Sequence, residues 1–249
     1  MNAKRMAGIL LAAGWLGAVQ ADRYVVEPGT PGGTDTPPFN TWTNAATNIQ
    51  SAVNAAGDGE VVLVSNGTYG ATGSGTAFVG VNALYIDKNV RVQSVNGPAF
   101  TMLDGGYPVY TNRLVCLNKT GAVFSGFTVM RGCAARGGGA LIGSFGGVIT
   151  NCLIISNIAD RALGTDGGGG LATYTTTSYT GYVDNCTIQG NVAISNNGGG
   201  GWFRSRAVIQ NCDFVDNVCS QGVGRGGGIY VDGGIWLIGC LILLALRRR

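Results

Sequence analysis

The chain repeats a short pattern of apolar and polar positions. The nine residues Ile149–Asn157 return as Val183–Asn191 and Ile209–Asn217, and weaker copies run from Phe124 to Gly132 and from Leu237 to Ala245. The residues at the centres of the five copies are Phe127, Cys152, Cys186, Cys212 and Cys240. Repetition at such a period indicates stacked units, because each unit is too small to bury its own apolar face.

Within each copy, the central residue and the residue two positions later are apolar and alternate with polar residues, as in a half-buried strand. The residue three positions before the centre is also apolar, although in a continuous strand it would point to the opposite face. We therefore expect a bend between the two, at Gly126, Asn151, Asn185 or Asn211, because Gly and Asn tolerate the left-handed backbone of a tight corner. A second asparagine is expected to close each strand with another corner, at Asn157, Asn191 and Asn217.

Each copy is preceded by a run of glycines and a short apolar strand. The runs are Gly137–Gly139, Gly167–Gly170, Gly198–Gly201 and Gly226–Gly228. One unit then consists of three short strands joined by three corners. Chains of this kind wind into a parallel β-helix, in which each strand pairs with its copy in the next coil.

The segments GGGAL…CLIISN, GGGGLATY…CTIQGN and GGGGWF…CDFVDN resemble the right-handed parallel β-helix superfamily that includes the pectin and pectate lyases. Their alternation of a Gly-Gly-aliphatic motif with Phe/Ile-x-x-Asn is also similar to the repeats of chlamydial polymorphic outer-membrane proteins. The resemblance covers roughly residues 24–246 and implies an all-β, right-handed parallel β-helix. From the repeats themselves we expect a solenoid of about seven coils, with three short strands per coil. The superfamily holds lyases, hydrolases, adhesins and proteins without known activity, so the resemblance specifies fold rather than function.

The rest of the chain divides into flanking segments. Residues 1–21 combine a basic start, an apolar stretch and small residues, which is typical of a secretory signal peptide. Residues 22–42 are a Gly/Pro-rich lead-in, and 43–57 predict a helix with Thr43 as N-cap and Gly57 as its end. This helix would cover the open edge of the first coil, and the β-helix itself is expected over 58–246.

The C-terminal residues 235–249 form an apolar run followed by Arg247–Arg249. The run is too short to span a bilayer, which needs about 20 residues. It is similar to bacterial C-terminal sorting tails, which would attach the protein to a membrane or envelope. The alternative is a last coil that is cut short, and the sequence leaves both open.

Composition limits the classes of partner and cofactor. The net charge is only +3 and 12% of the 249 residues are charged, so we expect no nucleic-acid partner. The cysteines of the repeat share one inward slot, so we expect a column of thiols that pack as small apolar residues. The chain has no histidine and no paired C-x-x-C, so we expect no metal site.

Candidate catalytic and binding residues are few. Without histidine there is no Ser-His-Asp triad. The superfamily's lyases use Ca²⁺ held by an acidic cluster, and its glycosidases use close aspartates. The candidates in this sequence are Asp184, Asp213 and Asp216. Their spacing fits neither arrangement well, so Ca²⁺ is expected only if the protein is a lyase. In the variable loops, Tyr174, Tyr179 and Tyr182 are candidates for contact with a sugar.

These observations favour an exported, non-enzymatic scaffold of the periplasm, cell surface or extracellular space. It would resemble an adhesin and contact polysaccharides or cell-surface glycans through its loops. The alternative is a polysaccharide lyase or glycoside hydrolase, or a fragment of one. A third hypothesis is an autotransporter-like passenger.

Overall fold

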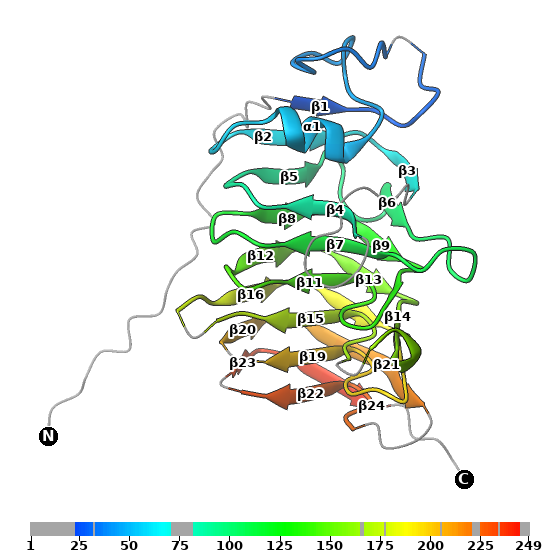
Figure 1. Ribbon diagram of the computed structural model, residues 1–249, viewed down its shortest axis with the longest axis vertical. Helices are drawn as coiled ribbons and strands as arrows, with labels where there is room; N and C mark the ends of the chain where they lie inside the picture. The colour runs from blue at the N-terminus through cyan, green and yellow to red at the C-terminus, as the bar shows by residue number, and fades with distance from the viewer. Residues whose placement is uncertain are drawn as a thin grey trace, which may run out of the picture.

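The computed structural model describes residues 23–31, 33–70, 82–164, 167–176, 178–204, 206–220, 225–233 and 235–244. The expected signal peptide and the Arg247–Arg249 run lie outside these residues. The described chain is a parallel β-solenoid whose strands form three parallel sheets (Figure 1). No helix among the described residues has the length and apolar character needed to cross a membrane.

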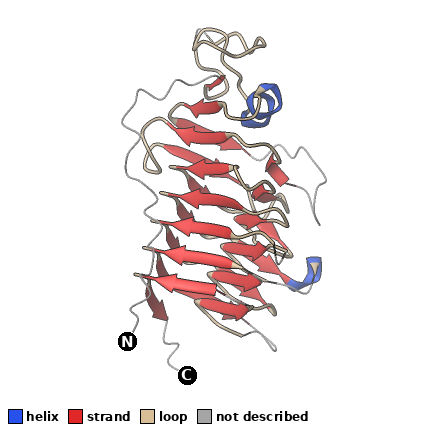
Figure 2. Ribbon diagram, turned by 90° about the vertical axis from the view of Figure 1, so that its left-hand side faces the viewer, coloured by secondary structure: helices blue, strands red, loops and turns tan. Residues whose placement is uncertain are grey.

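The first sheet has eight strands. In spatial order they are β1 (Arg23–Val25), β2 (Val61–Val64), β5 (Arg91–Ser94), β8 (Val123–Ser125), β12 (Gly147–Thr150), β16 (Gly181–Asp184), β20 (Ala207–Gln210) and β23 (Ile235–Ile238). The side view shows the strands of the solenoid stacked as rungs along the long axis (Figure 2).

The second and third sheets complete each coil. The ten-stranded sheet contains β3 (Gly67–Gly70), β6 (Thr101–Asp104), β9 (Thr128–Met130), β13 (Leu153–Ile155), β17 (Thr187–Gln189), β21 (Asp213–Ser220), β18 (Val192–Ile194), β14 (Ile158–Asp160), β10 (Cys133–Ala134) and, paired with β21, β24 (Leu241–Leu244). The six-stranded sheet contains β4 (Asn82–Ile86), β7 (Arg113–Leu117), β11 (Ala140–Ile142), β15 (Leu171–Tyr174), β19 (Gly201–Arg204) and β22 (Ile229–Asp232).

Equivalent positions of successive repeats lie beside one another. In the ten-stranded sheet, Val129 pairs with Ile154, Ile154 with Ile188, and Ile188 with Phe214. All four side chains are buried, which confirms the predicted solenoid. It has about five turns, slightly fewer than the seven expected.

The first predicted corner is confirmed. Asn151, Asn185 and Asn211 have φ values of 53°, 49° and 51°, and Gly126 has 84°. The second corner is one residue earlier than expected: the left-handed residues are Arg131, Ser156, Gly190 and Asp216. The asparagines that follow are buried, because their amides turn inward after the corner.

These inward asparagines form a hydrogen-bonded ladder. The Nδ2 atom of Asn157 donates to Oδ1 of Asn191 (3.0 Å) and to the carbonyl of Val129 (2.9 Å). Asn191 repeats the pattern with Asn217 (3.0 Å) and the carbonyl of Ile154 (2.9 Å). The ladder satisfies buried backbone groups at each corner, which would otherwise destabilise the coil.

A second interior column is made of thiols. Cys152, Cys186 and Cys212 are buried and Cys240 is half-buried, and all seven cysteines of the chain are free thiols. Burial raises the pKa of Cys186 well above its ordinary value, and the neighbouring thiols of Cys152 and Cys212 raise it further. The Cys186 thiol therefore stays neutral and packs as part of the core.

The glycine runs let adjacent coils approach closely. The N–H of Gly169 donates to the carbonyl of Gly198 (3.0 Å), and the N–H of Gly139 donates to the carbonyl of Gly170 (3.1 Å). A Cβ atom at Gly169 would lie 2.5 Å from the carbonyl oxygen of Val192 and closer still to that of Gly199. No side chain fits between these backbones.

The capping helix is shorter than predicted. Helix α1 spans Ile49–Ala55, and its N-cap is Asn48, whose side chain accepts from the N–H of Ser51 (3.2 Å), rather than Thr43. The chain before it cannot be helical, because Ala46 forms a parallel bridge with Val25 of β1. Ile49, Ala52 and Val53 are buried in the core cluster at this end of the solenoid.

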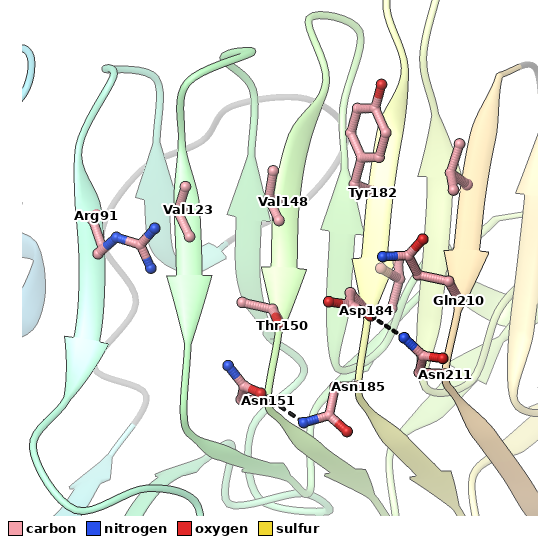
Figure 3. A pocket seen from close by; sticks show the side chains of 12 residues that line it. Arg91, Val123, Val148, Thr150, Asn151, Tyr182, Asp184, Asn185, Gln210 and Asn211 are labelled. Carbon is pink, nitrogen blue, oxygen red and sulfur yellow. Dashed lines mark hydrogen bonds between the residues drawn. The ribbon is translucent and has the colours of Figure 1, made fainter. Parts of the chain in front are cut away.

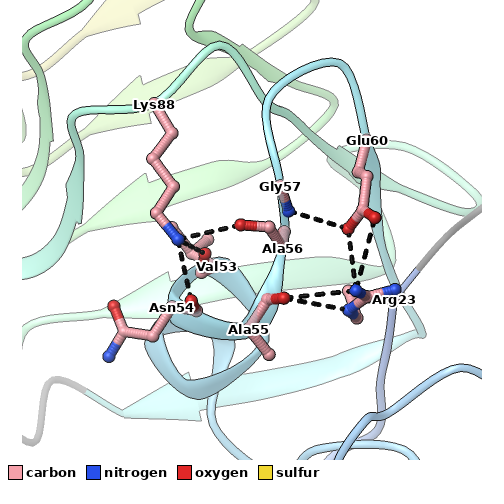
Figure 4. Close-up of polar contacts among 8 residues, drawn as sticks. All are labelled: Arg23, Val53, Asn54, Ala55, Ala56, Gly57, Glu60 and Lys88. Carbon is pink, nitrogen blue, oxygen red and sulfur yellow. Dashed lines mark hydrogen bonds and ion pairs between the residues drawn. The ribbon is translucent and has the colours of Figure 1, made fainter.

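The end of α1 is clamped by side chains from the first coils (Figure 4). The ammonium of Lys88 donates to the carbonyls of Val53 (3.2 Å), Asn54 (2.7 Å) and Ala56 (2.8 Å). Arg23 pairs with Glu60 (3.0 Å) and donates to the carbonyl of Ala55 (3.2 Å). A cation here supplies hydrogen-bond donors to the carbonyls of the last turn and interacts favourably with the C-terminal end of the helix dipole.

Candidate binding surface

A groove of about 410 Å³ crosses the outer face of the eight-stranded sheet (Figure 3). Because alternate residues of a strand point outward, two rows of side chains line it. One row runs Arg91, Val123, Val148, Tyr182 and Val208. The other row runs Thr150, Asp184 and Gln210.

The exposed corner asparagines form the border of the groove. The Nδ2 atom of Asn185 donates to Oδ1 of Asn151 (2.7 Å), and that of Asn211 donates to Oδ1 of Asp184 (3.0 Å). These polar groups recur once per coil, about 4.8 Å apart. A ligand along the solenoid axis would therefore meet a regular series of hydrogen-bond donors and acceptors.

The groove has little electrostatic character. Among the residues that line it, Asp184 supplies one carboxylate and Arg91 supplies one guanidinium. Arg91 is on β5 and Asp184 on β16, three strands apart in the sheet, which corresponds to roughly 14 Å. The net charge of the groove lining is zero, but the two groups are too far apart to form an ion pair.

The structure does not bring the three candidate aspartates onto one face. Asp184 lies in the groove on the eight-stranded sheet, whereas Asp213 and Asp216 are exposed on β21 of the ten-stranded sheet. Glycoside hydrolysis in most families needs two carboxylates on either side of one bond, about 5 to 9.5 Å apart. The residues that line the groove include one carboxylate.

The candidate tyrosines are likewise separated. Tyr174 packs on the outer side of the six-stranded sheet, stacked on Trp202 (6.1 Å between centroids) and beneath the guanidinium of Arg136 (4.1 Å). Tyr179 lies in the loop before β16 and contacts Phe145, and Tyr182 lies in the groove. The three side chains therefore belong to three different environments.

The groove also contains residues that sequence reasoning did not select as binding residues. Arg91, Val148 and Gln210 are among them, although strand alternation places all three on the outer face. Val148 lies beside Tyr182, Gln210 lies beside Asp184, and Arg91 lies further along the row of Tyr182. Phe145, beside Tyr179, stands in a turn where the sequence has no comparable periodic signal.

No group of three or more Cys, Asp or Glu residues within the described part of the chain is arranged to hold a metal ion. Ca²⁺ takes six to eight oxygen ligands, usually with several carboxylates. The single carboxylate of the groove does not make such a site.

Comparisons with known proteins give the chain no family. No protein-family model matches it, and no curated protein matches it. Among solved structures it is similar to ORF18 of Geobacillus virus E2, with 13% identity and a TM-score of 0.20 over 78% of this chain. The match covers 58% of that protein, and a similarity this low carries no inference about fold or function.

Proposed function

We propose that this protein is an exported, non-catalytic β-solenoid that binds a neutral polysaccharide along the groove of its eight-stranded sheet. The observation that carries the proposal is the groove lining: four amide side chains, one threonine hydroxyl, one tyrosine ring, several valines, and one carboxylate remote from one guanidinium. Amides donate and accept hydrogen bonds at once, as sugar hydroxyls do. Tyr182 adds an apolar ring that packs against sugar C–H groups.

The charge of the groove separates this proposal from uronate binding. Polymers such as pectate and alginate carry a carboxylate on each sugar, so a surface that selects them needs several cations along the chain. The groove supplies Arg91 alone, and Asp184 opposes it. We therefore assign a neutral polymer, although the superfamily that the sequence resembles includes enzymes acting on pectate.

The cellular part of the proposal depends on the flanking sequence. Residues 1–21 support export, and the apolar run with Arg247–Arg249 supports attachment to a membrane or envelope. The protein would then act as an adhesin-like scaffold at the cell surface or in the periplasm. Immunodetection of the tagged protein in fractionated cells tests this part, and retention in the cytoplasm would contradict it.

Binding is tested by retention on insoluble polysaccharides. We expect the protein to be retained on at least one of cellulose, xylan and β-1,3-glucan, and more weakly on calcium pectate gel. Tyr182→Ala and Gln210→Ala should each raise the dissociation constant roughly tenfold, the effect of about 1.4 kcal/mol at a central contact.

The matched control is Asp216→Asn, on the ten-stranded sheet. Asn tolerates the left-handed backbone of this corner (φ 51°), so the fold and the retention should be unchanged. Retention on pectate alone, or equal retention of the wild-type and Tyr182→Ala proteins, would overturn the assignment.

A further inference from the structure

A second depression lies where the chain turns from the six-stranded into the eight-stranded sheet. Its volume is about 410 Å³. Three turns and one loop precede β5, β8, β12 and β16 and stack on one another as the strands do. The depression is lined by Tyr85 of β4 and, from the turns and the loop, by Asp87, Asn118, Lys119, Thr120, Phe145 and Tyr179.

The depression has an aromatic wall that is open to solvent. Phe145 is 47% exposed, and its ring meets that of Tyr179 edge to face, with 5.4 Å between centroids. Tyr85 lies further along the same depression. A large apolar ring left exposed beside polar groups marks a place where a ligand can be bound.

The aromatic residues are held in place by their neighbours. Asn118 is only 9% exposed; its Nδ2 atom donates to the Tyr85 hydroxyl (3.0 Å), and its Oδ1 atom accepts from the N–H of Phe145 (3.2 Å). The Thr120 hydroxyl donates to the carbonyl of Phe145 (2.9 Å). The turn that carries Phe145 therefore needs little ordering when a ligand binds, which favours affinity.

The loop of Tyr179 is anchored to the same turn. The N–H of Thr176 donates to the carbonyl of Ser144 (3.1 Å), and the N–H of Tyr179 donates to the carbonyl of Thr176 (3.1 Å). The edge-to-face pair of Phe145 and Tyr179 is thus fixed from both turns.

The polar residues of the depression point to an uncharged ligand with many hydroxyls. Asp87 supplies a carboxylate and Lys119 an ammonium, and both residues are exposed. Together they carry no net charge, yet the carboxylate accepts and the ammonium donates hydrogen bonds. This combination suits sugar hydroxyls better than it suits an anion or a cation.

We propose that this depression binds one pyranose ring of a neutral glycan. The C–H face of the ring packs on Phe145 and Tyr179, and its hydroxyls bond to Asp87 and Lys119. Tyr179 precedes Tyr182 of the groove by three residues, a separation of roughly 10 Å in extended chain. The site is distinct from the groove, and its existence does not depend on binding there.

Saturation-transfer NMR with methyl β-D-glucopyranoside, methyl β-D-galactopyranoside and methyl N-acetyl-β-D-glucosaminide tests the site. We expect transfer to the ring C–H protons of at least one glycoside. Phe145→Ala should raise the dissociation constant at least tenfold. Phe100→Ala provides the matched control, because Phe100 is another turn phenylalanine, 55% exposed, outside the depression.

Three outcomes would overturn the inference: no transfer to any of the three glycosides, unchanged transfer in Phe145→Ala, or equal loss in Phe100→Ala. If Gln210→Ala rather than Phe145→Ala abolishes the transfer, the sugar is bound in the groove and this second site is wrong. Retention on insoluble polysaccharide that is lost in Tyr182→Ala reports on the groove separately, so the two proposals can fail independently.

Discussion

Asn191→Ala is expected to lower the free energy of unfolding by about 3–5 kcal/mol, because several buried polar groups lose their partners at once. The side chain of Asn191 accepts from the backbone N–H and Nδ2 of Asn157 and donates to the carbonyl of Ile154 and to Oδ1 of Asn217. Alanine leaves all of these groups without that partner in a coil that water does not reach. Urea unfolding followed by far-UV circular dichroism measures the change.

The control for this change is Asn185→Gly in the same coil. Asn185 stands at the exposed corner with φ 49°, where glycine is well tolerated, and its side chain donates one bond, to Asn151. We expect a change within about 1 kcal/mol. Equal losses in the two variants would mean that the inward ladder does not stabilise the stack.

Gly169→Ala is expected to destabilise the solenoid by on the order of 3–5 kcal/mol or to prevent folding, because the added methyl group meets backbone rather than side chains. The nearest atoms are the carbonyl oxygens of Gly199, in the next glycine run, and of Val192, the first residue of β18. Relief of this contact would require the coils to separate and the bonds between their glycine runs to lengthen. Soluble yield and thermal unfolding of the purified variant measure the effect.

Gly190→Ala separates this steric effect from backbone strain. Gly190 has φ +61°, and a Cβ there would meet nothing within 4 Å. Alanine should therefore cost only the strain of the left-handed backbone, about 1–2 kcal/mol. A larger loss at Gly190 than at Gly169 would contradict the close approach of the coils.

The repeat made the strands and the first corner predictable, because inward side chains must be apolar and corners need Asn or Gly. The second corner was misplaced by one residue because Ser156 and Asn157 can both turn a chain. The deciding factor is the bond that the Asn157 amide makes to Val129 and Asn191 inside the solenoid. The bonded residues are 28 and 34 positions apart in the sequence. The residues around Asn157 therefore do not predict these bonds.

The ends of the capping helix are also set by contacts with residues distant in the sequence. Thr43 is an acceptable N-cap by local preference, but the bridge of Ala46 to β1 delays the helix to Ile49. Lys88 satisfies the last carbonyls from another coil, which no helix-end pattern within 43–57 reveals.

The candidate surface was only partly predictable. The sequence places Tyr182 in a variable loop, whereas the residue lies on strand β16. The outward place of Asp184 on the same strand follows from strand alternation and could be read from the repeat. The separation of Tyr174, Tyr179 and Tyr182 could not, because it depends on how one irregular loop packs on the turn of Phe145. Loop packing of this kind follows no period.

The central functional claim is that the groove binds its polymer without cleaving it. The most direct measurement incubates the protein with soluble xylan, β-glucan and polygalacturonate and follows both reducing ends and absorbance at about 235 nm, where the unsaturated products of lyases absorb. We predict no product above the level of a protein-free control, since the described groove contains one carboxylate and no acid–base pair. Turnover by the wild type that is lost in Asp184→Asn would contradict the account and make the protein an enzyme.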